Sequence, residues 1–162
     1  MKKEIAIFAA GCFWGVEELI RKIPGVLDTH VGYCGGDAES ALYLRVKTGQ
    51  TNHAEAVQVT FDSAVISYEQ ILEHFFKLHD PTTLNQQGND IGSQYRSAIF
   101  FLSEEQKITA ERVKSKVEQS GKWSRPIVTA IVPASEFFNA EDYHQDYLQK
   151  NPNGYTCHYW RE

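Results

Sequence analysis

The chain has 162 residues, of which 42% are hydrophobic and 12% aromatic, and its 16 basic and 21 acidic side chains give a formal net charge of −5. This length can bury a full hydrophobic core in one domain, and the composition excludes a disordered chain. Since no basic stripe accompanies the acidic balance, we expect no nucleic acid and no membrane surface as a partner. We therefore predict a single domain over residues 1–162.

The N-terminal residues partly resemble a secretory signal peptide. Lys2 and Lys3 precede an apolar run, residues 5–10, that ends shortly before Cys12. This run is shorter than the roughly 7 to 15 apolar residues of a secretory signal, and Glu4 lies at its start. No other stretch approaches the about 20 apolar residues of a transmembrane helix. The expected location is the cytoplasm.

The cysteines of the chain are Cys12, Cys34 and Cys157. An odd number of cysteines, in a chain long enough to fold without disulfides, is a poor match to a secreted disulfide framework. We therefore expect intracellular thiols that are either reactive or inert.

Apolar periodicity in the first half of the chain predicts a strand, a helix and two strands, at residues 4–9, 16–23, 26–33 and 54–61. The helix ends at Pro24-Gly25, because proline cannot continue it. The last of these strands shows the clearest alternation, with Val57, Val59 and Phe61 separated by polar residues.

The second half predicts a helix, a strand, a helix, a strand and a helix, at residues 67–78, 97–102, 103–121, 127–132 and 139–150. Ser67 with Gln70, and Ser103 with Gln106, each predict a capping box at a helix start. The polar loop 81–94 is long enough to be functional or mobile. The alternation of strands and helices indicates an α/β or α+β fold in two packed layers.

Cys12 lies between a predicted strand and a predicted helix, in the run Gly11-Cys12-Phe13-Trp14-Gly15. The N–H groups and dipole of a helix N-terminus favour an anion, so a thiolate would be stabilised there and its pKa lowered. The two aromatic rings beside the sulfur suit an apolar group bound next to a nucleophile. The alternative is a buried, inert cysteine.

Two further segments carry polar chemistry. Glu55 begins a predicted strand among apolar residues, where desolvation raises the pKa of a carboxyl group and lets it donate a proton; the alternative is a surface glutamate. Asp90, Tyr95 and Arg96 lie together in the long loop, which could equally be a solvated connection.

Other functions would need the same residues. A cysteine hydrolase would pair Cys12 with His53 or His144. A metal site built on Cys157 and His158 lacks any paired Cys-x-x-Cys or His-x-x-x-His spacing, so we predict no metal. A binding module without chemistry is the remaining alternative.

Six motifs in order resemble the A class of peptide methionine sulfoxide reductases over nearly the whole chain. They are Gly-Cys-Phe-Trp-Gly at 11–15, Gly-Tyr-x-Gly-Gly at 32–36, His-Ala-Glu-Ala-Val at 53–57, His-Asp-Pro-Thr at 79–82, Gly-Asn-Asp-Ile-Gly-x-Gln-Tyr-Arg-Ser at 88–97 and Ala-Glu-Asp-Tyr-His-Gln-x-Tyr at 140–147. The resemblance implies an α+β fold, a two-layer α/β sandwich around a mixed, ferredoxin-like sheet with an irregular C-terminal tail.

The resemblance also implies an activity, the reduction of methionine-S-sulfoxide, free or in proteins, to methionine in the repair of oxidative damage. It assigns the nucleophile to Cys12, which would become a sulfenic acid, and the proton donor to Glu55. It implies a monomer that needs no cofactor and uses thioredoxin or dithiothreitol as reductant.

The remaining assignments follow from the same resemblance. Phe13 and Trp14 would form the pocket for the S-methyl group, while Tyr43, Asp90 and Tyr95 would surround the sulfoxide oxygen, Asp90 through water. The resolving thiol would be Cys157, in a mobile tail over residues 151–162, and Cys34 is its rival. Three features depart from the usual pattern: Asn52 replaces a glycine, the residues before Tyr43 differ from Asn-Pro-Thr, and the tail carries one cysteine where some members carry two.

Overall fold

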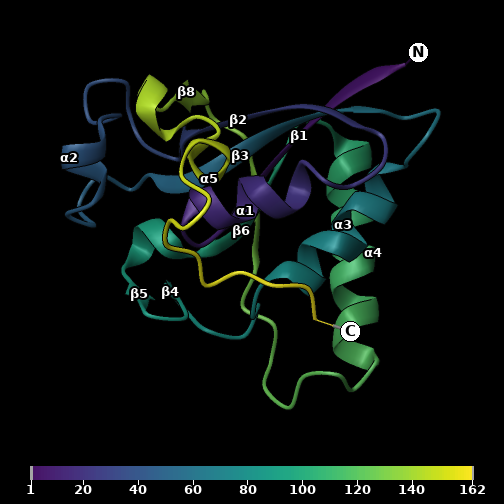
Figure 1. Ribbon diagram of the computed structural model, residues 1–162. Coiled ribbons are helices and arrows are strands. Elements are labelled where there is room, and N and C mark those ends of the chain that lie inside the picture. Colours follow the sequence, from purple (N-terminus) through teal and green to yellow (C-terminus); the bar gives the residue numbers. More distant parts are fainter. Residues whose placement is uncertain (1, 162) are drawn as a thin grey trace.

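The computed structural model describes residues 2–161. Within these residues, one mixed sheet has the strand order β7-β6-β1-β3-β2-β8 (Figure 1). The pair β6 and β7 is parallel and the other neighbours are antiparallel. The strands are β1 (Lys3–Ala10), β2 (Val26–Cys34), β3 (Ala54–Asp62), β6 (Ser97–Phe101), β7 (Ala130–Pro133) and β8 (Phe138–Asn139). A separate hairpin pairs β4 (Gln86–Gln87) with β5 (Asp90–Ile91).

The longer helices cover one face of this sheet. The helices are α1 (Phe13–Ile20), α2 (Tyr43–Val46), α3 (Tyr68–Leu78), α4 (Glu104–Gln119) and α5 (Tyr147–Lys150), with 3-10 turns η1 (Ser93–Tyr95) and η2 (Asp142–His144). Alternate strand side chains such as Phe8, Val57 and Ile99 point to this face and pack against α1 and α3 in the main core. None of the helices within residues 2–161 is both long and apolar enough to span a bilayer.

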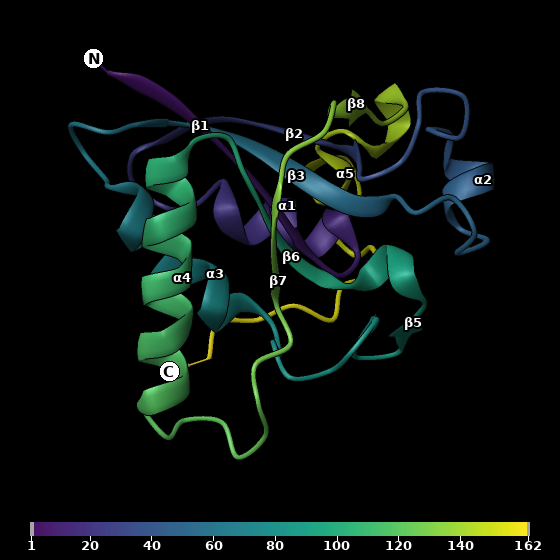
Figure 2. The same cartoon turned by 180° about the vertical axis from the view of Figure 1, so that it is seen from behind.

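The opposite face of the sheet carries small side chains, among them Ala9, Cys34, Ala54 and Ala98, which form a second buried cluster. Ala134 and Phe137 pack on this cluster. Figure 2 shows the extended stretch that carries β7 crossing this side of the sheet toward β8. Because the underlying residues are small, an extended chain can cover this face without a helix.

Most of the predicted strands and helices are confirmed. The capping box at Ser67 is complete, since its side chain accepts from Gln70 N–H and the Gln70 side chain returns to Ser67 N–H. At Ser103 only half of the box forms. The Gln106 side chain instead accepts from Leu102 N–H and donates to Ile5 O, so it ties α4 to the first strand.

The predicted helix over 139–150 is wrong. Asn139 belongs to β8 and pairs with Gly32, and the chain then forms only the short η2 and α5. Asp146 interrupts the helix with a left-handed φ of 54°. The cause is tertiary, because the Gln145 side chain bonds to the backbone of Val31 instead of leaving the segment free to wind. The predicted strand over 127–132 likewise starts later, at Ala130.

The long polar loop 81–94 is ordered. It contains the β4–β5 hairpin and runs into η1. The Gln87 side chain accepts from Asp80 N–H at 2.9 Å and donates to Asp80 O at 2.8 Å, which closes the base of the loop. Asp90 and Tyr95 are therefore carried on a defined scaffold.

Candidate active site

Cys12 is the N-cap residue of α1. Gly11, with a left-handed φ of 99°, turns the chain out of β1, and the helix begins at Phe13. At this helix start, Phe13 N–H donates to Glu55 Oε1 at 3.2 Å, and the Trp14 N–H lowers the pKa of the neighbouring Cys12 thiol, which itself makes no capping hydrogen bond. One helix end thus brings a thiol and a carboxyl group together.

The Cys12 thiol is 8% exposed, and its pKa lies well above the ordinary range. Burial is the largest cause, the Glu55 carboxylate adds to it, and the Trp14 N–H only partly offsets both. This direction is the reverse of the sequence-based expectation for a thiol at a helix N-terminus. Desolvation outweighs the dipole of a helix that has only eight residues.

Glu55 enters the same space from β3, where it pairs with Tyr33 of β2. It is 2% exposed, and burial raises the pKa of its carboxyl group to about 8, against the opposing Phe13 N–H. Glu55 is therefore largely protonated at neutral pH. The sequence-based prediction of a desolvated acid agrees with this direction.

Three more of the predicted residues converge from separate elements. Tyr43 starts α2, Tyr95 ends η1, and Asp90 lies in β5. Burial raises the pKa of all three side chains, and the charges of Glu55 and Cys12 add to the shift of both phenols. The charge of Asp90 in turn raises the pKa of Cys12 and of Glu55, so all three groups lie within electrostatic range of the thiol and the carboxyl group.

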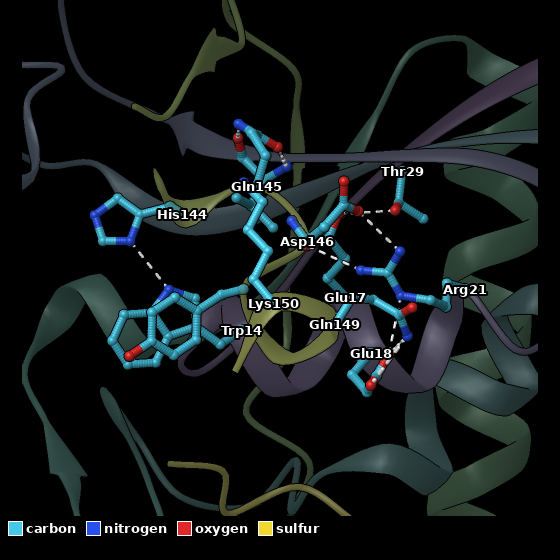
Figure 3. Close-up of polar contacts among 12 residues, drawn as sticks. Trp14, Glu17, Glu18, Arg21, Thr29, His144, Gln145, Asp146, Gln149 and Lys150 are labelled. Atoms are coloured by element: carbon cyan, nitrogen blue, oxygen red, sulfur yellow. Dashed lines mark hydrogen bonds and ion pairs between the residues drawn. The ribbon is translucent and has the colours of Figure 1, made fainter. Parts of the chain in front are cut away.

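The two aromatic residues of the motif have different surroundings. Phe13 is 1% exposed and packs within the core against Tyr33. Trp14 is partly buried, and its ring stacks on Tyr147 with centroids 3.8 Å apart. Its Nε1 donates to His144 Nδ1 at 3.0 Å (Figure 3). Sequence reasoning named His144 only as a hydrolase partner of Cys12 and did not name Tyr147, although both lie in the quoted motif at 140–147.

The C-terminal tail, yellow in Figure 1, passes over the start of α1. His158 is buried and its Nε2 bonds to Ala10 O at 2.7 Å. A β-carbon added at Gly15 would collide with His158 Nδ1 and Thr156 Oγ1, so this glycine permits the close approach. The tail is thus held against the same helix that begins beside Cys12.

Cys157 lies in this part of the tail, partly buried, as a free thiol. Its sulfur is 3.8 Å from Gln87 O and 3.9 Å from Asp90 Oδ2, and Tyr155 donates to the same Asp90 oxygen at 3.1 Å. Its charge acts on the pKa of Cys12. The β4–β5 hairpin therefore holds Cys157 on the side of the sheet where Cys12 lies.

Cys34 lies on the other side of the sheet. It is fully buried in the second cluster, and its sulfur is 3.8 Å from Ser135 O. Its neighbour across the strands is Ala54, whereas Glu55 pairs with Tyr33 and points to the α1 face. Successive strand residues face opposite sides, so the sheet separates Cys34 from Cys12.

The histidines considered for a hydrolase have other partners. His53 accepts from Gly36 N–H at 3.1 Å and bonds to Asp37 O at 2.7 Å, which fixes the glycine-rich turn. His144 is bonded to Trp14. Within residues 2–161, no group of three or more His, Cys, Asp or Glu side chains is placed to hold a metal ion.

Comparison with known proteins decides the family. A sequence model described as "Peptide methionine sulfoxide reductase" matches residues 4–162. The chain belongs to the peptide methionine sulfoxide reductase family. It is 54% identical to a Mesorhizobium japonicum protein named "Peptide methionine sulfoxide reductase MsrA 1", over 98% of this chain and 90% of that one.

Solved structures agree with this assignment. The chain matches Mxr1 from Saccharomyces cerevisiae in reduced form with a TM-score of 0.93 and 41% identity, over 99% of this chain and 93% of that one. It matches Mxr1 in complex with Trx2 with a TM-score of 0.68 and 29% identity, over 99% and 91%. The resemblance, the enzyme class and the mixed α/β fold predicted from the motifs are confirmed, and the activity is thiol-dependent reduction of methionine sulfoxide.

Proposed function

We propose that this reductase acts on methionine-S-sulfoxide, with Cys12 as nucleophile and Glu55 as proton donor. The observation that carries the proposal is the start of α1, where Phe13 N–H binds the Glu55 carboxyl group beside the N-cap residue Cys12 and the charge of Glu55 acts on the Cys12 thiol. A protonated carboxyl group beside a thiol supplies both partners that reduction of a sulfoxide requires.

The first step conserves atoms and protons. The Cys12 sulfur attacks the sulfoxide sulfur while Glu55 donates its proton to the oxygen. The hydroxyl group then moves from the substrate sulfur to the Cys12 sulfur, the bond between the two sulfur atoms breaks, and methionine leaves with Cys12 as a sulfenic acid. The proton that leaves the Cys12 thiol restores Glu55. Because both groups hold their protons at rest, no proton from solvent is needed.

The surrounding residues orient the substrate in this proposal. Trp14, with Phe13 behind it, forms the subsite for the S-methyl group, here called the methyl subsite. Tyr43 and Tyr95 donate to the sulfoxide oxygen, and Asp90 reaches it through water. Their raised pKa values support these roles, since both phenols keep their protons at neutral pH.

The second step restores the thiol of Cys12. Cys157 attacks the sulfenic acid, a disulfide between the two cysteines forms, and water leaves. The contacts of Cys157 with the hairpin on the α1 side support it over Cys34, which the sheet separates from Cys12. Thioredoxin, or dithiothreitol in the test tube, then reduces the disulfide; the complex of Mxr1 with Trx2 supports this choice of partner.

Further proposals concern the architecture and the setting. The four strands in the order β6-β1-β3-β2, with α1 and α3 as their crossovers, support a ferredoxin-like unit.

Residues 151–162 would be a mobile tail of the single domain. This tail would loosen to bring Cys157 to Cys12 while His158 tethers it. We also propose a monomer that needs no metal or other cofactor and works in the cytoplasm; the free cysteines support the reducing compartment.

The epimer preference tests the proposal most directly. With dithiothreitol as reductant, the enzyme is expected to consume the S epimer of a methyl sulfoxide and to leave the R epimer essentially untouched, because one enzyme serves each epimer. Chiral chromatography of the remaining sulfoxide measures this. Equal consumption of both epimers would refute the stereochemical assignment.

Gly15→Ala is expected to impair recycling. Alanine favours the helix by about 0.8–1 kcal/mol over glycine, but its β-carbon collides with Thr156 and His158 and displaces the tail that carries Cys157. The first turnover should be retained, whereas steady-state turnover with thioredoxin falls severalfold. Comparison of burst amplitude with steady-state rate checks this, and an unchanged steady-state rate would show that the tail contact with α1 is dispensable.

A further inference from the structure

Glu17 is a buried carboxylate on α1 that the reaction does not use. It is 1% exposed. Its Oε2 accepts from the Thr29 hydroxyl at 2.8 Å, its Oε1 accepts from Asp146 N–H at 3.0 Å, and Arg21 Nη2 lies 3.4 Å from Oε1 (Figure 3). A buried charge is costly unless such partners surround it. What Glu17 does therefore depends on what these partners hold in place.

The partners fix one turn of the chain against α1. Asp146 has its left-handed φ here, and its Oδ1 accepts from Arg21 Nη1 at 2.8 Å. The preceding Gln145 accepts from Val31 N–H at 2.9 Å and donates to Val31 O at 2.8 Å. The turn at residues 145–146 is thus anchored on one side to α1 and on the other to β2.

The residues on either side of this turn hold the indole of Trp14. His144, before the turn, accepts the indole N–H at 3.0 Å, and Tyr147, after it, stacks on the ring at 3.8 Å with an interplanar angle of 10°. Burial lowers the pKa of His144, which keeps Nδ1 free to accept. Figure 3 shows the Trp14 contact and the Glu17 cluster on opposite sides of the α5 segment.

We propose that Glu17 is a positioning residue that sets the width of the methyl subsite through Trp14. Glu17 and Trp14 lie on the same helix, three positions apart, and the 144–147 segment links them from outside the helix. Loosening the turn at 145–146 releases both contacts of the indole. This inference rests on the proposed role of Trp14 in binding the S-methyl group.

The test is Glu17→Gln, which keeps the shape of the side chain. The Thr29 hydroxyl and the Asp146 N–H donate to different carboxylate oxygens. In glutamine one of these oxygens is replaced by an NH2 group that cannot accept, so one charge-assisted acceptor and the attraction to Arg21 are lost. We expect kcat/KM for a methyl sulfoxide to fall about tenfold, mainly through KM, and its preference over the matching ethyl sulfoxide to fall severalfold, since one methylene is worth about 10–200-fold in a well-shaped pocket.

A second measurement, tryptophan fluorescence, reports on the surroundings of Trp14 and does not depend on enzyme activity. In a chain with Trp123→Phe and Trp160→Phe, Trp14 is the single tryptophan, and Glu17→Gln should shift its emission to longer wavelength and lower its anisotropy. Asp146→Ala should change the substrate preference and the Trp14 fluorescence in the same direction. Because the Asp146 side chain is 51% exposed, this variant replaces Glu17→Gln if that variant does not fold.

The control is Glu69→Gln on α3, a carboxylate that pairs with Arg112 at 2.8 Å far along the chain from Trp14. It should leave the substrate preference and the emission unchanged. In a Trp14→Ala background, Glu17→Gln should no longer alter the preference, because its effect acts through the indole.

Three results overturn the proposal. Unchanged preference and unchanged Trp14 emission in Glu17→Gln would make Glu17 an ordinary structural residue. A full effect of Glu17→Gln that persists without Trp14 would do the same. If Trp14→Ala itself keeps the parent preference, the assignment of the methyl subsite fails first and this inference fails with it, whereas the roles of Cys12 and Glu55 stand.

Discussion

Cys12→Ser is expected to abolish methionine sulfoxide reduction in single turnover as well as with recycling, whereas Cys157→Ser is expected to lose only recycling. The chemistry at Cys12 precedes resolution, so Cys157→Ser should still release roughly one methionine per enzyme and then stop. Rapid quench followed by quantification of methionine separates the two outcomes. Mass spectrometry of Cys157→Ser after one turnover should find the oxygen on Cys12.

The control for this pair is Cys34→Ser. Its sulfur lies in the cluster on the far face of the sheet, 3.8 Å from Ser135 O, so both the first turnover and recycling should match the parent. The competing outcome is a disulfide between Cys12 and Cys34 in the oxidised parent, together with normal recycling by Cys157→Ser. That result would make the glycine-rich turn the source of the resolving thiol and the tail merely structural.

The strands and the long helices could be predicted because each carries its own periodicity. Val57, Val59 and Phe61 alternate toward the main core, and the strand over Ala54–Asp62 is found where this pattern places it. Ser67 caps its helix with residues of the same turn. These features depend on neighbours in sequence, which a single chain reveals.

The segment after Asn139 could not be predicted in the same way. Its apolar and polar residues favour a helix, but Asp146 and Gln145 are held by Glu17 and Val31, more than a hundred residues earlier. The indole bond from Trp14 to His144 is equally long-range. Such contacts override local propensity, and nothing in the sequence of the segment announces them.

The pKa of Cys12 shows the same limit within the site. The position at a helix start predicts a lowered pKa, and the Trp14 N–H does act in this direction. Burial of the thiol and the carboxyl group from β3 reverse the direction. Motif spacing could nominate candidate residues of the site, whereas their protonation depends on how deeply the fold buries them.

Glu55→Gln is expected to lower the rate of the reductase step by roughly 10² to 10⁴, the usual contribution of a positioned general acid. The amide keeps the shape of the side chain, and its oxygen still accepts from Phe13 N–H, so the start of α1 should be undisturbed. It lacks the proton that the sulfoxide oxygen needs. Single-turnover kinetics measure the step, and Glu69→Gln serves as the remote control at the parent rate.

The same variant should change how stability depends on pH. Burial raises the pKa of Glu55 from an ordinary 4.5 to about 8, so between these values the folded protein binds more protons than the unfolded chain. The contribution of Glu55 is therefore fully present below pH 4.5 and is lost as the pH rises through 8. At pH 9, Glu55→Gln should exceed the parent in free energy of unfolding by roughly 3–5 kcal/mol more than it does at pH 4.

Denaturant unfolding at both pH values, for parent and variant, checks this difference. Gain of stability at high pH together with loss of the reductase step is the signature of a group kept buried for its proton, because the fold tolerates the carboxyl group only at a cost. A variant within about twofold of the parent in single turnover, with the same pH dependence of unfolding, would assign Glu55 a purely structural role. The proton donor would then have to be one of the two phenols, Tyr43 or Tyr95, whose pKa values are also raised by burial.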